Sequence, residues 1–151
     1  MSIRLKIGGF EELIKEIEKA EGNADAACEQ ALKKSAVIME DELTAEMEKS
    51  HVDSKLISRM PSYEIEKNHG LITARVGYKK GAYNPDNLSD GYKVVFANYG
   101  TPRRSKHGKI VDVSDGGKIK LGFIDRAKRK AKPKIYRVQK KTLEEILRGL
   151  K

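Results

Sequence analysis

The strongest constraint on the fold of this 151-residue chain is a long run of small and apolar residues at helical spacing. Asn23 precedes the run and is a suitable N-cap. The run continues to about Lys49, and its stripe is narrow and starts with small side chains, which lets a second element approach closely. We therefore predict one long helix. The stripe consists of Ala24, Ala27, Cys28, Ala31, Leu32, Ser35, Ile38, Met39, Leu43 and Met47.

Two shorter elements are predicted before this helix. Ile3, Leu5 and Ile7 alternate with basic residues, which is typical of a half-buried strand, and Gly8-Gly9 ends it. Apolar residues then recur at three- and four-residue spacing from Phe10 to Ile17, which indicates a short amphipathic helix.

The periodicity changes to two after Pro61. Residues 63–66 and 71–78 alternate around the turn Asn68-His69-Gly70, so they predict a β-hairpin. Residues 92–99 contain the apolar run Val94-Val95-Phe96-Ala97, which we interpret as a third, central strand of this region.

The remaining chain predicts an excursion followed by helices. Ile110–Val113 and Lys118–Leu121 flank Ser-Asp-Gly-Gly and indicate a small hairpin. Helical spacing returns from Gly122, and Pro133 fits the first turn of a second C-terminal helix. The predicted fold class is α+β: an antiparallel sheet of about four strands with a long helix packed on one face, plus a basic hairpin excursion and C-terminal helices. We expect one domain, 1–151, with a mobile basic arm at about 101–121.

Charge is distributed unevenly between the two parts of the chain. Residues 1–99 carry 14 Lys/Arg and 17 Asp/Glu, a net −3, whereas residues 100–151 carry 17 Lys/Arg and 5 Asp/Glu, a net +12. Such asymmetry favours an anionic partner, although a solvated surface that maintains solubility is an equal alternative. The loop residues expected to contact DNA or a neighbouring subunit are Arg103, Arg104, Lys106, Lys109, Lys118 and Lys120. A second basic group, expected on or near a helix, is Arg126, Lys128, Arg129, Lys130, Lys132 and Lys134.

No pattern of catalytic or metal-binding residues is found. His51, His69 and His107 lie far apart, and Cys28 is the only cysteine, so neither zinc-ligand spacing nor an intrachain disulfide is present. Gly8-Gly9 is not followed by a phosphate-binding motif. We expect no enzyme activity, metal or cofactor, and keep a hydrolase or nuclease as a third alternative. The sequence has no apolar run of membrane-spanning length and no signal peptide, so we expect a protein made in the cytoplasm without membrane contact.

Four segments carry a family resemblance when they are taken in order. They are Ile7–Leu13, His51–Leu56, Phe96–Thr101 and Gly122–Ala127. Together they resemble a minor structural protein of tailed phages with non-contractile tails, of the tail-completion or head–tail joining family. This chain lacks the family's Pro and Gly in the second segment, and it has Asn98 where the family often has Glu.

The resemblance implies a structural subunit that forms a ring, hexameric in the virion, at the head–tail junction or tail end. Its implied partners are copies of itself and neighbouring head-completion and tail-tube proteins, with non-specific DNA contact through the basic arm. It implies assembly in the bacterial host's cytoplasm and a final place in the virion. The family positions, expected to be structural, are Val52, Asp53, Tyr99, Gly100, Thr101 and Phe123. The alternative is a small cytosolic protein that binds nucleic acid non-specifically through its basic C-terminal half.

Overall fold

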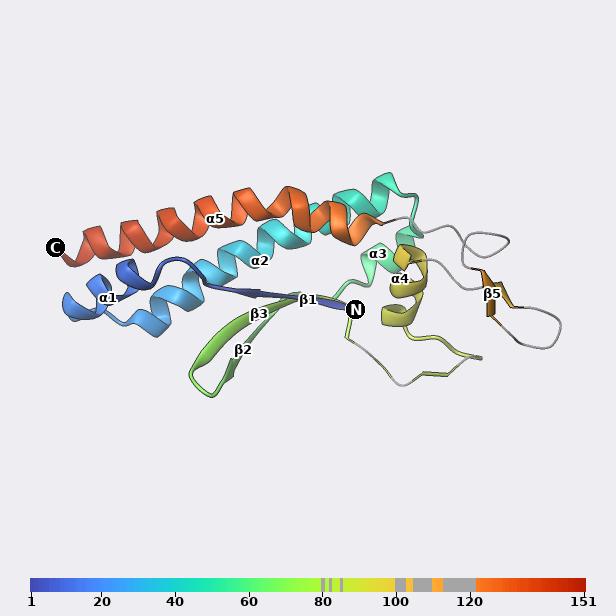
Figure 1. Ribbon diagram of the computed structural model, residues 1–151, viewed down its shortest axis with the longest axis horizontal. Helices are drawn as coiled ribbons and strands as arrows, with labels where there is room; N and C mark the ends of the chain where they lie inside the picture. The colour runs from blue at the N-terminus through green and yellow to red at the C-terminus, as the bar shows by residue number, and fades with distance from the viewer. Residues whose placement is uncertain (80, 82, 85, 100–102, 105–109, 113–121) are drawn as a thin grey trace.

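Two long antiparallel helices dominate the fold. The computed structural model describes residues 1–79, 81, 83–84, 86–99, 103–104, 110–112 and 122–151. Helices α2 (Ala24–Lys49) and α5 (Phe123–Leu150) run side by side along the long axis of the molecule (Figure 1). The small side chains predicted for the stripe of α2 are buried at Ala27, Ala31 and Ser35. Ala36 of α2 and Ala131 of α5 are buried as well. These residues allow the two helices to pack closely over most of their length.

Local signals set the ends of α2 as the sequence predicts. The Asn23 side-chain oxygen accepts a hydrogen bond from the Ala26 N–H at 3.0 Å, so Asn23 is the N-cap. At the C-terminal end, His51 has a left-handed backbone with φ of 55°. The Val52 N–H donates to the Met47 carbonyl at 3.0 Å, which is the bonding pattern of a Schellman motif.

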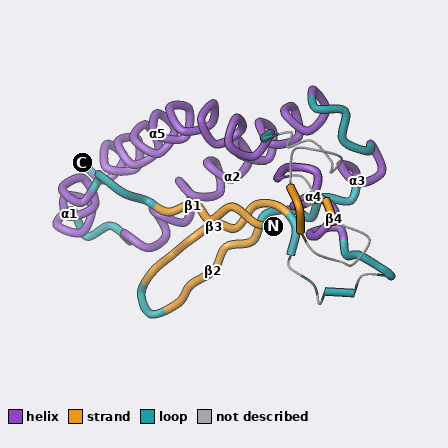
Figure 2. The backbone as a smooth tube through the Cα atoms, turned by 45° about the vertical axis from the view of Figure 1, so that its right-hand side comes forward, coloured by secondary structure: helices purple, strands orange, loops and turns teal. Residues whose placement is uncertain are grey.

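A three-stranded antiparallel sheet lies on one side of the helix pair (Figure 2). Its strands are β1 (Ser2–Lys6), β2 (Glu64–Asn68) and β3 (Leu71–Gly77), in the order β1-β3-β2. The predicted hairpin is confirmed: His69 and Gly70 form its turn with φ of 50° and 78°. Ile3, Ala74 and Val76 are buried beneath α2, whereas Arg4 and Glu64 on the opposite face are exposed.

The prediction of about four strands is wrong, because residues 92–99 belong to a helix. Helix α4 spans Asp90–Tyr99, and its buried residues Gly91, Val94 and Asn98 recur at three- and four-residue spacing. A short apolar run cannot be assigned to strand or helix by periodicity alone. In this case the buried positions follow the helical period, and Asp90 lies in the first turn, where a carboxylate is favourable.

The prediction of two C-terminal helices is also wrong, since α5 is continuous and contains Pro133. Proline has no N–H to donate to the carbonyl four residues earlier, that of Arg129. Because Pro133 is exposed, that carbonyl lies on the solvent side of the helix. The buried residues Ala127, Ala131, Gln139 and Leu143 lie on both sides of Pro133 and hold the two halves against α2.

The predicted basic hairpin is described only in part. Strand β5 (Ile110–Asp112) pairs with β4 (Arg103–Arg104), and the expected partner segment, 118–121, lies outside the described residues. Two short helices, α1 (Glu11–Lys19) and α3 (Ser54–Ser58), complete the described elements. Helix α1 packs with α2 and α5 around buried Phe10 and Ile17, which form a second, smaller core cluster.

Candidate functional site

The predicted arm residues are only partly described by the structure. Arg103 and Arg104 form β4, which pairs with β5. The other four arm positions lie outside the described residues, as do two of the family positions; they are Lys106, Lys109, Lys118, Lys120, Gly100 and Thr101. Of the six predicted contact residues, the structure therefore describes Arg103 and Arg104 alone.

Val52 and Asp53 join helices α2 and α3. Val52 donates the backbone hydrogen bond that closes α2 and packs against the main core cluster. The Asp53 carboxylate accepts a hydrogen bond from the Lys55 N–H at 2.9 Å, so Asp53 is the N-cap of α3. Leu56 then enters the core with 6% exposure. These contacts fix the turn between the two helices.

Phe123 and Asn98 form the junction between α4 and α5. Gly122 precedes α5 with a left-handed backbone, φ of 64°, and has no side chain to cap the helix. The cap comes from Asn98, whose side-chain oxygen accepts from the Ile124 N–H at 2.8 Å and whose carbonyl accepts from the Gly122 N–H at 3.0 Å. Phe123 is fully buried beside this junction, and Tyr99 is the last residue of α4.

A group of ion pairs between α2 and α5 takes up three residues of the second basic group. We call it the charge ladder; its members are Glu42, Glu46, Arg126, Lys130 and Lys134. Its residues recur every four positions on each helix, about one turn apart, so the two helices present matching rows. Glu46 is the centre of the ladder: it is 2% exposed and contacts both Arg126 and Lys130. The Arg126 Nε lies 2.9 Å from the Glu46 Oε2.

The two cations hold Glu46 in its ionised form. Hydrogen bonds from Lys130 and Arg126 lower the pKa of Glu46 to about 2 from its ordinary value near 4.5, against the opposing effect of burial. Arg126 also donates to the Ser50 hydroxyl at 2.7 Å, and Lys49 approaches Glu46 at 3.7 Å. Sequence reasoning missed this ladder, although the four-residue spacing of Glu42 and Glu46 matches that of the basic residues on α5.

Four further basic residues of α5 are exposed and form no ion pair with the residues that the structure describes. Within the described part of the chain, no ion pair involves Lys128, Arg129, Lys132 or Arg137. Of the second basic group, the structure therefore assigns half to internal pairs and leaves half exposed to solvent or a partner.

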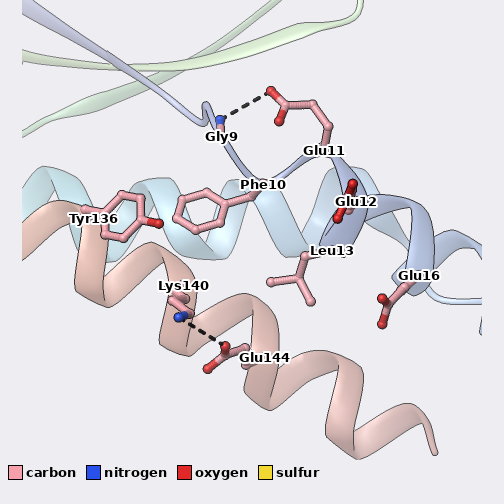
Figure 3. Close-up of a pocket in the computed structure, with 9 residues that line it drawn as sticks. All are labelled: Gly9, Phe10, Glu11, Glu12, Leu13, Glu16, Tyr136, Lys140 and Glu144. Atoms are coloured by element: carbon pink, nitrogen blue, oxygen red, sulfur yellow. Dashed lines mark hydrogen bonds and ion pairs between the residues drawn. The ribbon is translucent and has the colours of Figure 1, made fainter.

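An acidic pocket of about 500 Å³ lies between α1 and α5 (Figure 3). The rings of Phe10 and Tyr136 form one wall, with centroids 5.0 Å apart. The carboxylates around the pocket are Glu11, Glu12, Glu16 and Glu144. Backbone hydrogen bonds, including one from the Gly9 N–H at 3.2 Å, lower the pKa of Glu11, so it lacks the raised pKa that a general acid requires.

Glu40, unlike Glu11, has a raised pKa, and its carboxyl group makes a structural hydrogen bond. Burial raises the pKa of Glu40, and its side chain accepts a hydrogen bond from the Tyr63 N–H at 2.6 Å. This bond ties α2 to the segment that leads into β2. His51 and His69 are exposed in separate turns. Among the residues that the structure describes, no cluster of His, Cys, Asp and Glu could hold a metal ion.

Comparisons with protein-family models, with curated proteins and with solved structures found no match to this chain. No helix in the described ranges combines the length and apolar character that crossing a membrane requires.

Proposed function

We propose that this chain is a structural subunit of a tailed phage or prophage virion and forms a ring at the head–tail junction or the tail end. One observation carries the proposal. The described positions of the family resemblance lie at joints between helices: Val52 and Asp53 join α2 to α3, while Tyr99 and Phe123 flank the α4–α5 junction. Residues at such joints determine shape, and shape and assembly are the function that the resemblance implies.

The mechanism we propose is heterologous contact between copies that closes into a cyclic ring of six subunits. The helix pair and sheet form the wall, and the basic segment 101–121 contacts a neighbouring subunit or the DNA that passes through the ring. Adjacent head-completion and tail-tube proteins are the other partners. The protein is made in the cytoplasm of the bacterial host and incorporated into the virion.

The test is disruption of the gene in the phage or prophage that carries it. We expect electron microscopy to show separate heads and tails, or tails of abnormal length, and a plasmid copy to restore complete particles. Mass spectrometry of purified particles should detect the chain. Infectious, normal particles that lack the chain would contradict the proposal. Deletion of residues 103–120 should impair docking while leaving the circular dichroism spectrum and cooperative unfolding unchanged.

A second candidate function is non-specific nucleic-acid binding. It is favoured by exposed cations of α5 that form no ion pair in the described part of the chain, namely Lys128, Arg129, Lys132 and Arg137. Phosphate neutralisation by such residues gives an affinity that falls steeply with salt. Duplex-DNA binding across a salt series, with light scattering in the same buffers, separates the two functions. Tight binding by a monomer with a steep salt slope would favour the second function.

A further inference from the structure

The sheet ends in two free edges that carry opposite charges. Among the described residues, no strand pairs with the outer edge of β1 or with the outer edge of β2. Arg4 and Lys6 lie on β1, whereas Glu64 and Glu66 lie on β2. All four side chains belong to the same face of the sheet, because Arg4 and Glu64 are both aligned with Arg75 of the central strand. An open edge presents backbone N–H and C=O groups that can pair with another strand.

The turn of the hairpin determines which residues of β2 direct their backbone groups outward. His69 and Gly70 form a two-residue turn, so Asn68 and Leu71 are a hydrogen-bonded pair. Hydrogen-bonded and non-bonded pairs alternate along an antiparallel ladder. Ile65 and Lys67 therefore direct their backbone N–H and C=O groups to the free edge.

The same alternation continues through β3 to β1. Ala74 and Val76 of β3 bond to Leu5 and Ile3, so Ser2, Arg4 and Lys6 direct their backbone groups outward. A side-chain contact agrees with this direction: the Lys6 carbonyl accepts a hydrogen bond from the Gln139 side chain of α5 at 3.4 Å. Arg4 is thus the basic residue of β1 whose outward backbone groups have no hydrogen-bond partner among the described residues, whereas the Lys6 carbonyl already has one on α5.

A groove of about 510 Å³ follows the free edge of β1 and has α5 as its other wall. Its apolar lining comes from both sides of the groove and its base: Ile3, Leu5, Met39, Ile135 and Tyr136. Lys128 and Lys132 of α5 also line it. The groove therefore offers apolar surface and positive charge beside the outer edge of β1, which has no partner strand among the described residues. An exposed sheet edge with side-chain pockets beside it is the surface to which a further strand is added.

We propose that the free edge of β1 pairs with the free edge of β2 in a second copy of this chain, so that successive copies form one continuous sheet. This inference rests on the proposed ring function and names the surface that joins the subunits. β1 and β2 are both antiparallel to β3, so they are parallel to each other. Rotation about an axis along the strands keeps that direction, so the new pair is parallel. The interface is heterologous, as a ring requires.

Backbone and side-chain alternation agree in this pairing. The outward groups of Arg4 bond to those of the second copy's Ile65 and Lys67, which places Arg4 opposite the second copy's Glu66. A shift by two residues places Lys6 opposite Glu66 and Arg4 opposite Glu64. In both registers a basic residue faces an acidic residue on the same face of the sheet, and such cross-strand pairs stabilise a sheet.

The charges at the two edges can satisfy one another. Within the described residues, neither Arg4 nor Lys6 has an ion-pair partner. Glu64 pairs with Lys79 at 2.8 Å and Glu66 with Arg75 at 2.9 Å. A carboxylate has two oxygens and accepts several hydrogen bonds, so each Glu can contact a second cation without losing its internal one.

Two charge-reversed variants test the interface: Arg4→Glu with Lys6→Glu, and Glu64→Lys with Glu66→Lys. Sedimentation velocity and light scattering are measured from micromolar to millimolar concentration. We expect the wild-type chain to associate. The association constant of each variant alone should be at least about tenfold lower, because each variant places like charges opposite one another across the interface. An equimolar mixture should regain association, because each reversed edge then meets its complement.

The mixture distinguishes a lost interface from a lost fold, since an unfolded variant cannot be rescued by the other. Association of either variant at the wild-type level, failure of the mixture to associate, or a wild-type chain that stays monomeric at millimolar concentration would overturn the pairing. The proposed function is judged separately, by detecting the chain in virions. If the chain is found in virions and both charge-reversed variants still assemble there, the proposed function stands and this interface is wrong. If the chain associates through these strands but is absent from virions, the interface stands and the proposed function is wrong.

Discussion

The charge ladder and the free edge of β1 contain the same kinds of basic residue in opposite situations. In the ladder, Arg126 and Lys130 meet the buried carboxylate of Glu46 within the chain. On β1, Arg4 and Lys6 have no ion-pair partner in the described part of the molecule. A positive charge counted in the sequence therefore does not identify a binding surface. The arrangement of carboxylates in space separates the cations that serve the fold from those available to a partner.

The difference has an energetic cause. Burying a carboxylate as fully as Glu46 is costly unless cations and hydrogen bonds compensate, so removing a partner on either helix leaves an unfavourable state. Exposed cations such as Arg4 remain hydrated and need no partner for folding. The following experiments test whether the two regions differ in this way.

The largest expected effect is that of Glu46→Ala. It removes the acceptor of both Arg126 and Lys130 and a fully packed side chain, and we expect a loss of about 2–3 kcal/mol in the free energy of unfolding, since hydrogen bonds to charged groups contribute about this much. Chemical denaturation measures it. Glu48→Ala is the matched control, because Glu48 is exposed on the same helix, and it should change stability by less than about 0.5 kcal/mol. Equal effects at both positions would remove the distinction.

Lowering the pH should also remove the contribution of Glu46 to the free energy of unfolding, by protonating its carboxylate. Its pKa is lowered in the folded state from about 4.5 to about 2, so its stabilising effect is complete above pH 4.5 and is lost as the pH falls toward 2. We expect Glu46→Gln to show a smaller loss of stability than the wild-type chain between pH 5 and pH 2. The measurement is denaturation at a series of pH values. Parallel curves for the two proteins would show that Glu46 has an ordinary pKa in the folded state.

A neutral contact at the start of α5 provides the next comparison. Asn98→Ala removes the side-chain oxygen that accepts from the Ile124 N–H, and loss of a helix cap costs about 1 kcal/mol. Thermal and chemical denaturation measure this loss, and unchanged stability would contradict the cap assigned to Asn98. Since this contact carries no ionic charge, its contribution should not respond to salt, unlike that of the ladder.

The sequence predicted the elements that local signals specify. The stripe of α2, the Asn23 cap and the turn at Asn68-His69-Gly70 act within a few residues, and the structure confirms all three. Residues 92–99 were assigned wrongly because four consecutive apolar residues fit a buried strand and a buried helix equally well. Pro133 was misplaced because the sequence does not show that packing on both sides of it holds one helix together.

The candidate site was less predictable than the fold. The basic residues of α5 could be identified, but their internal partners could not, because Glu46 and Arg126 are 80 residues apart and meet only when α2 and α5 pack. Likewise, Asn98 caps a helix that begins 25 residues later, beyond the range of any local capping pattern. Opposite charges on β1 and β2 are visible in the sequence, whereas their positions at the two edges depend on the strand order.

The smallest expected effect comes from two neighbouring lysines of α5 that receive the same substitution. Lys130→Gln removes a cation from the ladder, and because that side chain is half exposed we expect a loss of only about 1 kcal/mol. Lys132→Gln removes a cation that lines the groove beside β1 and has no ion pair among the described residues, so stability should change by less than about 0.5 kcal/mol.

Salt identifies the cause of any difference between these two variants. At about 1 M salt the screening length is near 3 Å, so a charge effect at the half-exposed Lys130 should shrink and the two variants should approach each other in stability. A difference that persists in high salt would come from packing of the lysine stem, because that contribution is not screened. In that case the ladder would stabilise the helix pair mainly by contact, and its contrast with the free edge of β1 would rest on burial and not on charge.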